Sequence, residues 1–255
     1  MTTETETIVV RDEGNLRVIL LNRPTAANAL DIAMLDALVR ALHEVADCAA
    51  RAVVIAGCGR NFCAGSDLKA ARADPAGMSL RLRFNPLALA LDSLNIPVVA
   101  AVNGAAAGGG LALALMADMR VMGEGARLVP SWLPLGLVPD LGASWHIAQA
   151  LGPARAFDWL ARATPMKAAE AMEYGLANRV VADGSELVEA IALARELAAI
   201  PGPAIALTRQ LLRNAAGRTL AQQLEAEAQG QDAAMRDSDQ IAALAARVEQ
   251  LGRSR

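Results

Sequence analysis

Aromatic side chains are rare in this sequence, and basic side chains do not outnumber acidic ones. Phe, Trp and Tyr make up 3% of the 255 residues, whereas hydrophobic residues make up 54%. A large core is therefore available, and it must be packed from small and aliphatic side chains. Lys and Arg number 24 against 27 Asp and Glu, which gives a net charge of −3. This balance argues against nucleic-acid binding, which normally requires a basic face.

Histidine and cysteine are also scarce. The two histidines, His43 and His146, lie far apart, and Cys48, Cys58 and Cys63 show no metal-binding spacing. Each cysteine is expected to be a small buried hydrophobe. The N-terminal residues MTTETETIVV are polar and acidic, unlike a signal peptide. We therefore expect a cytoplasmic protein with reduced thiols and no metal site.

One stretch of the chain, residues 97–117, carries no charge. Its length approaches the roughly 20 residues that a membrane helix needs. However, it contains a proline, an asparagine and the triplet Gly108-Gly109-Gly110. A buried strand, a loop and a small-residue helix explain this composition better, so no membrane span is expected.

The order of periodic segments predicts an α/β protein with a helical tail. Two β-rich runs around Asp12-Glu13-Gly14-Asn15 predict a hairpin, and Asp31 is expected to cap the first helix. Strands and helices alternate up to about residue 182, and the rest is helical. Pro201-Gly202-Pro203 is the best boundary between a core over residues 1–200 and a helical region over 201–255. The expected strands are 8–11, 16–21, 53–56, 96–101, 118–122 and 178–181. The expected helices are 32–45, 78–94 with a kink near Pro86, 143–151, 153–163 and 166–174, while 127–135 is expected to be irregular or partly helical.

The glycine triplet follows a buried strand and begins a helix. The first backbone N–H groups of a helix have no partner within the helix. Glycine lets a ligand approach these groups closely, and the helix dipole adds partial positive charge. The triplet is therefore either a tight turn or an anion-binding site made of backbone N–H groups.

Five short motifs occur in order along the chain: NRP…NAL at 22–30, FCAGSDL at 62–68, NG…GGG at 103–110, LGLVPD at 135–140 and AAEA…YGLA at 168–177. Together they resemble the crotonase superfamily, the enoyl-CoA hydratase/isomerase family, over about residues 7–215. The resemblance implies a crotonase-like spiral of β-β-α units with a C-terminal helical region, which contributes to oligomerisation and covers the site. It also implies a homotrimer or a hexamer made of two trimers, and an acyl-CoA substrate whose coenzyme A needs no further cofactor.

In the family, two backbone N–H groups hold the oxygen of the acyl-CoA thioester. By motif position, the resemblance assigns these groups to Ala64 and Gly109. Removing a proton beside a thioester puts negative charge on this oxygen, which two fixed donors stabilise. Arg23 is either a phosphate contact or a solvated side chain, and Asp67 is more consistent with a loop brace or a helix cap than with a catalyst. The residues expected to line the path of the substrate and coenzyme A are Arg23, Ala27, Ala64, Gly65, Ser66, Asp67, Leu68, Gly108 and Trp132.

The resemblance breaks down at the catalytic acids. Hydratases of this family use two glutamates, because water must be deprotonated while the proton at the α-carbon is also managed. Here, the first position is Ala112, and the second is Ser131, or Trp132 if the alignment slips by one. None of these residues is a general base, so hydratase activity is in doubt.

One acid, Asp140, matches the position where isomerase members carry their single carboxylate. One carboxylate is enough to move a double bond, because it can take a proton from one carbon and return it to another. Apolar neighbours such as Leu137, Val138 and Leu141 would raise its pKa, which suits a base. The alternative role of Asp140 is to cap the helix expected at Ala143.

These residues favour an acyl-CoA isomerase that shifts a double bond, as in Δ3-Δ2 enoyl-CoA isomerisation or the related ring opening of aromatic epoxy-CoA thioesters. An enoyl-CoA hydratase is the alternative enzyme. A catalytically weak acyl-CoA-binding or scaffold protein is the alternative from another class.

Overall fold

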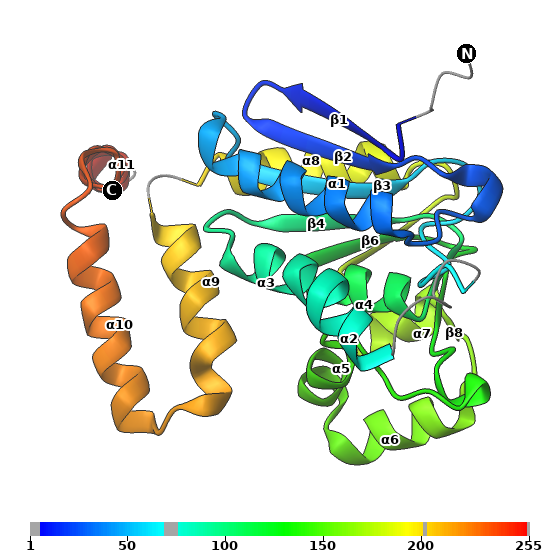
Figure 1. Cartoon of the computed structure of the whole chain (residues 1–255). Coiled ribbons are helices and arrows are strands. Elements are labelled where there is room, and N and C mark those ends of the chain that lie inside the picture. Colours follow the sequence, from blue (N-terminus) through cyan, green and yellow to red (C-terminus); the bar gives the residue numbers. More distant parts are fainter. Residues whose placement is uncertain (1–5, 69–75, 201–202, 254–255) are drawn as a thin grey trace.

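The computed structural model describes residues 6–68, 76–200 and 203–253, and a six-stranded sheet forms its centre (Figure 1). The first two strands pair antiparallel as a hairpin, and all later neighbours in this sheet are parallel. The middle strands are buried on both faces, which explains their unbroken hydrophobic sequences. The strands, in spatial order, are β1 (Ile8–Glu13), β2 (Leu16–Leu21), β3 (Ala52–Gly57), β4 (Val98–Val102), β6 (Met119–Gly123) and β9 (Arg179–Val181).

Helices cover both faces of this sheet. The helix α8 (Glu186–Ala198) packs on one face against side chains such as Val54 and Val99. The other face carries the larger core, to which α1 (Ile32–His43), α3 (Asn85–Ser93) and α4 (Gly109–Met116) contribute. Figure 1 shows α1 and α8 on opposite sides of the strands.

A second sheet, of three strands, leads directly into the glycine triplet at 108–110 and fixes its position. It contains β5 (Ala105–Ala107), β7 (Arg127–Val129) and β8 (Met166–Lys167) in that order. Because β5 ends directly before Gly108, this sheet fixes where α4 begins. The remaining helices of the body are α2 (Ala76–Ser79), α5 (Ala143–Leu151), α6 (Pro153–Arg162) and α7 (Ala168–Glu173).

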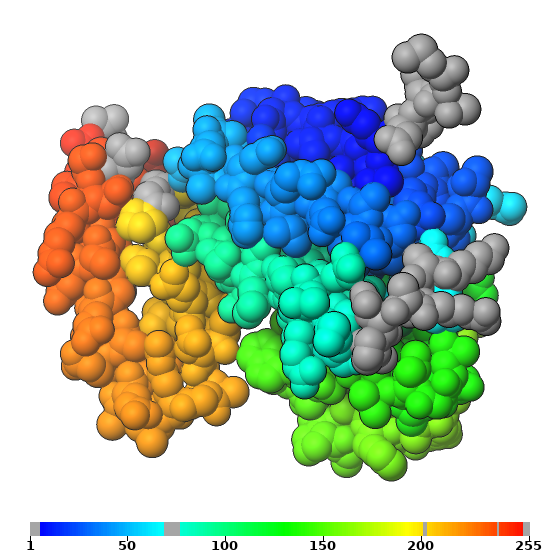
Figure 2. Space-filling view, viewed as in Figure 1, coloured from blue at the N-terminus to red at the C-terminus, as the bar shows by residue number. Residues whose placement is uncertain are grey.

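The last three helices form an arm at one side of the body, and they are α9 (Ala204–Asn214), α10 (Leu220–Ala234) and α11 (Ser238–Arg253) (Figures 1 and 2). Arg209 of α9 attaches the arm to the body, because its guanidinium contacts Asp118 at 2.8 Å and caps carbonyl groups at the end of α3, including that of Leu91 at 3.0 Å. Figure 2 shows the body hollowed beside the arm, where a cavity of about 300 Å³ is lined by Trp145, His146 and Arg213.

Most long elements agree with the sequence prediction. The hairpin is confirmed, and the Asp31 side chain accepts a hydrogen bond from Met34 N at 2.8 Å, as a helix cap does. No helix among the described residues has the length and apolarity of a membrane span. The predicted boundary falls partly on Pro201 and Gly202, which lie outside the described residues.

The helix expected over 78–94 with a kink near Pro86 is confirmed, because α2 and α3 are joined by a π-helical turn at Leu80–Phe84, just before Pro86. Two other local predictions are wrong in part. The stretch 127–135, expected to be irregular or partly helical, ends in the helical turn Leu133–Leu135 but begins with the strand β7. The helix expected from Met166 begins only after β8. Strands of two or three residues show no periodicity, which explains why the sequence did not reveal them.

Candidate active site

The glycine triplet forms a backbone turn at the start of α4. Gly108 has a φ of 48°, which favours glycine, and its N–H donates to Val129 O at 3.0 Å. Gly109 is the first residue of α4, and its N–H has no acceptor within the described residues. A buried helix start therefore presents a free donor, as predicted for this residue.

The second loop of the site is joined to the first through backbone atoms. Cys63 N donates to Ala105 O at 3.1 Å, and Ala107 N donates to Cys63 O at 2.8 Å. Gly65 follows with a φ of 90°, and a Cβ there would lie 2.6 Å from Ala107 O and 3.0 Å from Gly109 N. Only glycine allows this approach, so the loop at 63–66 and the triplet form one unit.

The hydrogen bonds correct the position of the second donor. Ala64 N donates to Ala27 O at 2.9 Å, so this N–H is not free to bind a substrate oxygen. Leu30 pairs with the next residues, since its N–H donates to Gly65 O at 2.7 Å and its carbonyl accepts from Asp67 N at 3.0 Å. In a parallel pairing, the residue between these two directs its N–H to the opposite side.

That residue is Ser66. Its nitrogen lies 3.6 Å from the position of a Cβ on Gly109, and its N–H has no acceptor in the described part of the chain. The free donors beside each other are therefore those of Ser66 and Gly109. The motif points to this loop, and the pairing with Leu30 determines which of its N–H groups remains free.

A buried amide, Asn28, holds the surrounding loops together. Asn28 is fully buried with a φ of 55°, next to Ala27 with a φ of 49°. Its side chain accepts from Arg23 N at 2.9 Å and donates to Cys58 O at 2.9 Å and Asn61 O at 2.8 Å. Sequence reasoning gave Asn28 no role of its own. The sequence feature that could have indicated a role is the position of Asn28 at the start of the motif NAL, shortly after the turn at Pro24.

Arg23 and Asp67 form a brace between the same loops. The Arg23 guanidinium lies 3.1 Å from Asp67 Oδ2 and 3.2 Å from Asp31 Oδ2. This confirms the interpretation of Asp67 as a loop brace. The phosphate contact expected for Arg23 stays a prediction, and two carboxylates already neutralise this guanidinium. Leu68, also predicted to line the path, is 54% exposed.

Cys63 is fully buried beneath these loops, as expected for a small hydrophobe. Burial raises the pKa of its thiol to about 12. The thiol is therefore neutral, and its sulfur donates to Asn28 O at 3.1 Å. A neutral thiol is a poor nucleophile, so Cys63 supports the loop rather than the chemistry.

Asp140 lies half-buried before α5. Its Oδ1 accepts a hydrogen bond from Trp132 Nε1 at 2.9 Å. Burial raises the pKa of the carboxyl, and the Trp132 bond opposes this rise. The raised pKa confirms the predicted direction, although Val138 is 76% exposed and Leu141 is the buried neighbour. The alternative role as a helix cap is wrong, because Gly142 occupies that position and no side chain caps α5.

The segment that carries Asp140 starts beside the glycine triplet. A Cβ on Gly108 would lie 2.8 Å from Ser131 Oγ, and the next residue, Trp132, holds Asp140. Trp132 is 4% exposed, so its ring is mostly enclosed by protein, and its predicted contact with substrate stays a prediction. Ala112 is fully buried on α4, and no glutamate occupies either family position.

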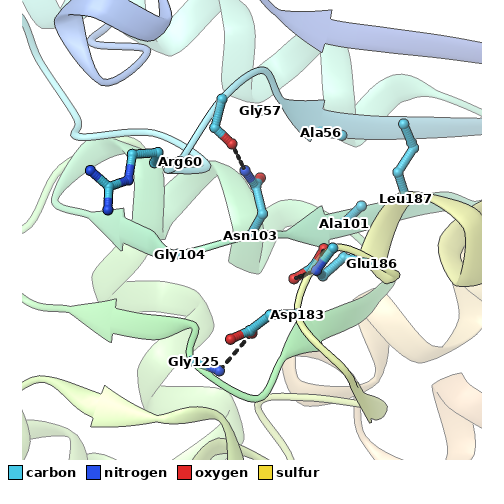
Figure 3. Close-up of a pocket in the computed structure, with 12 residues that line it drawn as sticks. Ala56, Gly57, Arg60, Ala101, Asn103, Gly104, Gly125, Asp183, Glu186 and Leu187 are labelled. Carbon is cyan, nitrogen blue, oxygen red and sulfur yellow. Dashed lines mark hydrogen bonds between the residues drawn. The ribbon is translucent and has the colours of Figure 1, made fainter.

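A cavity of about 440 Å³ lies elsewhere, at the ends of β3, β4, β6 and β9. Two of its polar side chains bond to glycine backbone: Asn103 Nδ2 donates to Gly59 O at 2.8 Å, and Gly125 N donates to Asp183 Oδ1 at 2.8 Å (Figure 3). The buried Asn103 Oδ1 has no hydrogen-bond partner among the described residues. The described residues that line it include none of the predicted site residues. Among the described residues, no group of three or more His, Cys, Asp or Glu is arranged to hold a metal ion.

Two adjacent backbone N–H donors without acceptors among the described residues form an arrangement that can bind a negatively charged oxygen. The chain belongs to the enoyl-CoA hydratase/isomerase family, whose model matches residues 11–252. Its fold is the crotonase fold, a spiral of β-β-α units.

Relatives in this family carry different reaction names. The chain is 36% identical to the 1,2-epoxyphenylacetyl-CoA isomerase of Escherichia coli K12, with 92% of each chain covered. Among solved structures, it is similar to an enoyl-CoA hydratase from Polaromonas sp. JS666, at 33% identity, a TM-score of 0.88 and coverage of 95% and 97% of the two chains. An enoyl-CoA hydratase from Bacillus anthracis matches with 30% identity, a TM-score of 0.89 and 96% of each chain covered.

Proposed function

We propose that this member of the family is an acyl-CoA isomerase that shifts a double bond through a thioester enolate. The observation that carries the proposal is the pairing of free Ser66 and Gly109 N–H groups with one carboxyl, Asp140, of raised pKa. The other carboxylate near the donors, Asp67, is held by Arg23. Ala112 and Ser131 supply no second base.

In the proposed reaction, the Asp140 carboxylate takes a proton from a carbon of the acyl chain. The electrons of the broken C–H bond move toward the thioester, and the oxygen gains negative charge. The Ser66 and Gly109 N–H groups stabilise this charge, and one such donor is worth roughly 3 kcal/mol in an oxyanion hole. Asp140, now a carboxylic acid, returns the proton to another carbon. No atom is gained or lost, so one acid is sufficient.

The aromatic epoxy-thioester reaction named for the Escherichia coli relative suits the same groups, because ring opening also develops charge beside a thioester. A hydratase remains the second candidate function, favoured by the names of the structural relatives. The homotrimer or hexamer, the cytoplasmic location, and a cover over the site formed by residues 201–255 also belong to this proposal.

The test compares 3-enoyl-CoA and 2-enoyl-CoA thioesters with the wild type and Asp140→Asn. The wild type is expected to convert 3-enoyl to 2-enoyl thioesters, and Asp140→Asn is expected to lose about 10²- to 10⁴-fold in turnover. Asp158→Asn is the matched control, because Asp158 is an exposed residue of α6 that pairs with Arg162.

Three outcomes would contradict the proposal. Unchanged isomerisation by Asp140→Asn would remove Asp140 from the mechanism. Rapid hydration of 2-enoyl-CoA by the wild type would favour a hydratase. Tight acyl-CoA binding without turnover of any thioester would favour a binding or scaffold protein.

A further inference from the structure

The bond between Trp132 and Asp140 is more than a packing contact. Trp132 Nε1 lies 2.9 Å from Asp140 Oδ1, and within the described residues it is the one side-chain donor to this carboxyl. An indole N–H only donates and carries no charge. It therefore fixes one oxygen of the carboxyl and leaves the other without a side-chain partner.

The chain builds this contact with two backbone turns. Trp132 O accepts from Leu135 N at 2.9 Å and Leu137 N at 3.1 Å, which folds the loop back toward the indole. On the other side of Asp140, Leu141 has a φ of 50° and Gly142 a φ of 77°. A left-handed leucine is uncommon and costs about 1–2 kcal/mol. Leu141 is 2% exposed, so core packing holds this conformation in place.

No charged side chain from a neighbouring element is among the causes of the Asp140 pKa shift. The described helix α4 has no titratable residue, and the titratable residue of α5 is His146, whose ring lies 3.6 Å from the position of a Cβ on Gly142. On α6, Arg155 lines a separate cavity, and Asp158 and Arg162 pair with each other. The pKa of Asp140 is thus set by burial, which raises it, and by the indole bond and a backbone hydrogen bond of Asp140 itself, which lower it.

We infer that Trp132 is a positioning residue for Asp140: its indole N–H holds Oδ1, so that Oδ2 is presented to the acyl chain as the proton-transferring oxygen. This inference rests on the proposed function. A neutral donor directs the carboxyl without the strong pKa depression that an arginine would cause. Asp140 therefore stays able both to take a proton and to return it.

The test is Trp132→Phe, which retains an aromatic ring but removes the N–H. Turnover is expected to fall about 10- to 100-fold, as for a misplaced catalytic group, with KM changing less than about threefold. The bond stabilises the charged carboxylate, so its loss raises the pKa of Asp140. The acidic limb of the kcat/KM profile should therefore move to higher pH, by about one pH unit.

Trp159→Phe is the matched control. Trp159 is 8% exposed and its indole donates to Thr164 O at 2.9 Å, so the substitution removes an equivalent buried bond away from the site. It is expected to lower stability without moving the pH profile. Where Trp132→Phe folds poorly, β-(3-benzothienyl)alanine at position 132 retains the ring shape and lacks the N–H.

The outcomes separate the two proposals. Unchanged turnover and an unmoved acidic limb in Trp132→Phe, with Asp140→Asn inactive, would overturn this inference alone. The same profile change in Trp159→Phe would also overturn it. Full isomerisation by Asp140→Asn would overturn the proposed function itself.

Discussion

At the scale of single residues, the buried side chain of Asn28 makes three hydrogen bonds to the backbone. Its amide satisfies the backbone N–H of Arg23 and two backbone carbonyls, those of Cys58 and Asn61, in the loop after β3. The same loop continues to Ser66. A buried polar group that loses its partner costs about 1–3 kcal/mol, so each lost bond matters.

Asn28→Ala is expected to lower the free energy of unfolding by about 3 kcal/mol, because it leaves buried backbone groups unpaired and puts alanine at a left-handed φ. Urea unfolding measures this change. Asn15→Ala, in the exposed hairpin turn between β1 and β2, is the control and should cost less than about 1 kcal/mol. Equal losses in the two variants would show that the loop bonds do not stabilise the fold.

The residue scale also shows where sequence reasoning ends. The motifs point to both loops and to Gly109, whose N–H has no acceptor within the described residues. They do not reveal that the Ala64 N–H donates a hydrogen bond to the Ala27 carbonyl, while the Ser66 N–H has no acceptor among the described residues. This difference depends on pairing between segments distant in sequence, which a single motif does not encode. Likewise, the motif at 135–140 points to Asp140 as a candidate acid. Its hydrogen bond to Trp132 depends on the backbone turns between residues 132 and 137, which the motif does not reveal.

At the scale of elements, α5 meets α9 and β6 through His146. The pKa of His146 is lowered from 6.5 to about 4, mainly by burial and then by the nearby Arg213 and Arg120, while Asp92 and Asp118 oppose the change. The folded protein therefore binds a proton at this position less readily than the unfolded chain does.

His146 contributes stability that is fully present above pH 6.5 and lost as the pH falls toward about 4. Over this window, the free energy of unfolding should fall by about 1–3 kcal/mol more in the wild type than in His146→Asn. Urea unfolding at pH 7.5 and 4.5 tests this difference. His43→Asn, on an exposed residue of α1, is the control. Parallel pH dependence in wild type and His146→Asn would refute the assignment.

Elements differ in how well the sequence predicts them. The strands β2, β3 and β4 are long buried runs, and α1 has both a cap and an apolar stripe. In contrast, β5, β7 and β8 have two or three residues and exist because they pair with one another. Since β5 positions the glycine triplet, the least predictable sheet fixes the most important backbone donor.

At the scale of the whole molecule, the arm leaves apolar side chains uncovered. Ile241, Leu244, Val248 and Leu251 form one stripe along α11 and are exposed by 46%, 45%, 59% and 57%. Side chains at this spacing share one face of a helix. The homotrimer or hexamer implied by the family resemblance stays a prediction, and we expect a second copy of the chain to pack on this stripe.

Val248→Glu is therefore expected to disrupt the oligomer, because it places a charge within the apolar contact. Light scattering after size exclusion should give a multiple of 26.5 kDa for the wild type and a lower multiple for the variant. Ala246→Glu adds the same charge on the opposite face of α11 and should keep the wild-type mass. A monomeric wild type, or equal dissociation of both variants, would contradict this arrangement.

The backbone bridge between Cys63 and Ala106 has a consequence for how such a chain diverges. In the proposed reaction, the groups that stabilise the enolate are main-chain atoms, so substitutions of the surrounding side chains would leave their chemistry intact. The acid at position 140 and the residues at 112 and 131 can change without altering those two donors. New reactions on thioesters can therefore arise through single replacements around an unchanged anion-binding frame. Loss of that frame would instead require a backbone change, such as a proline at position 66 or 109, or a bulkier residue at Gly65.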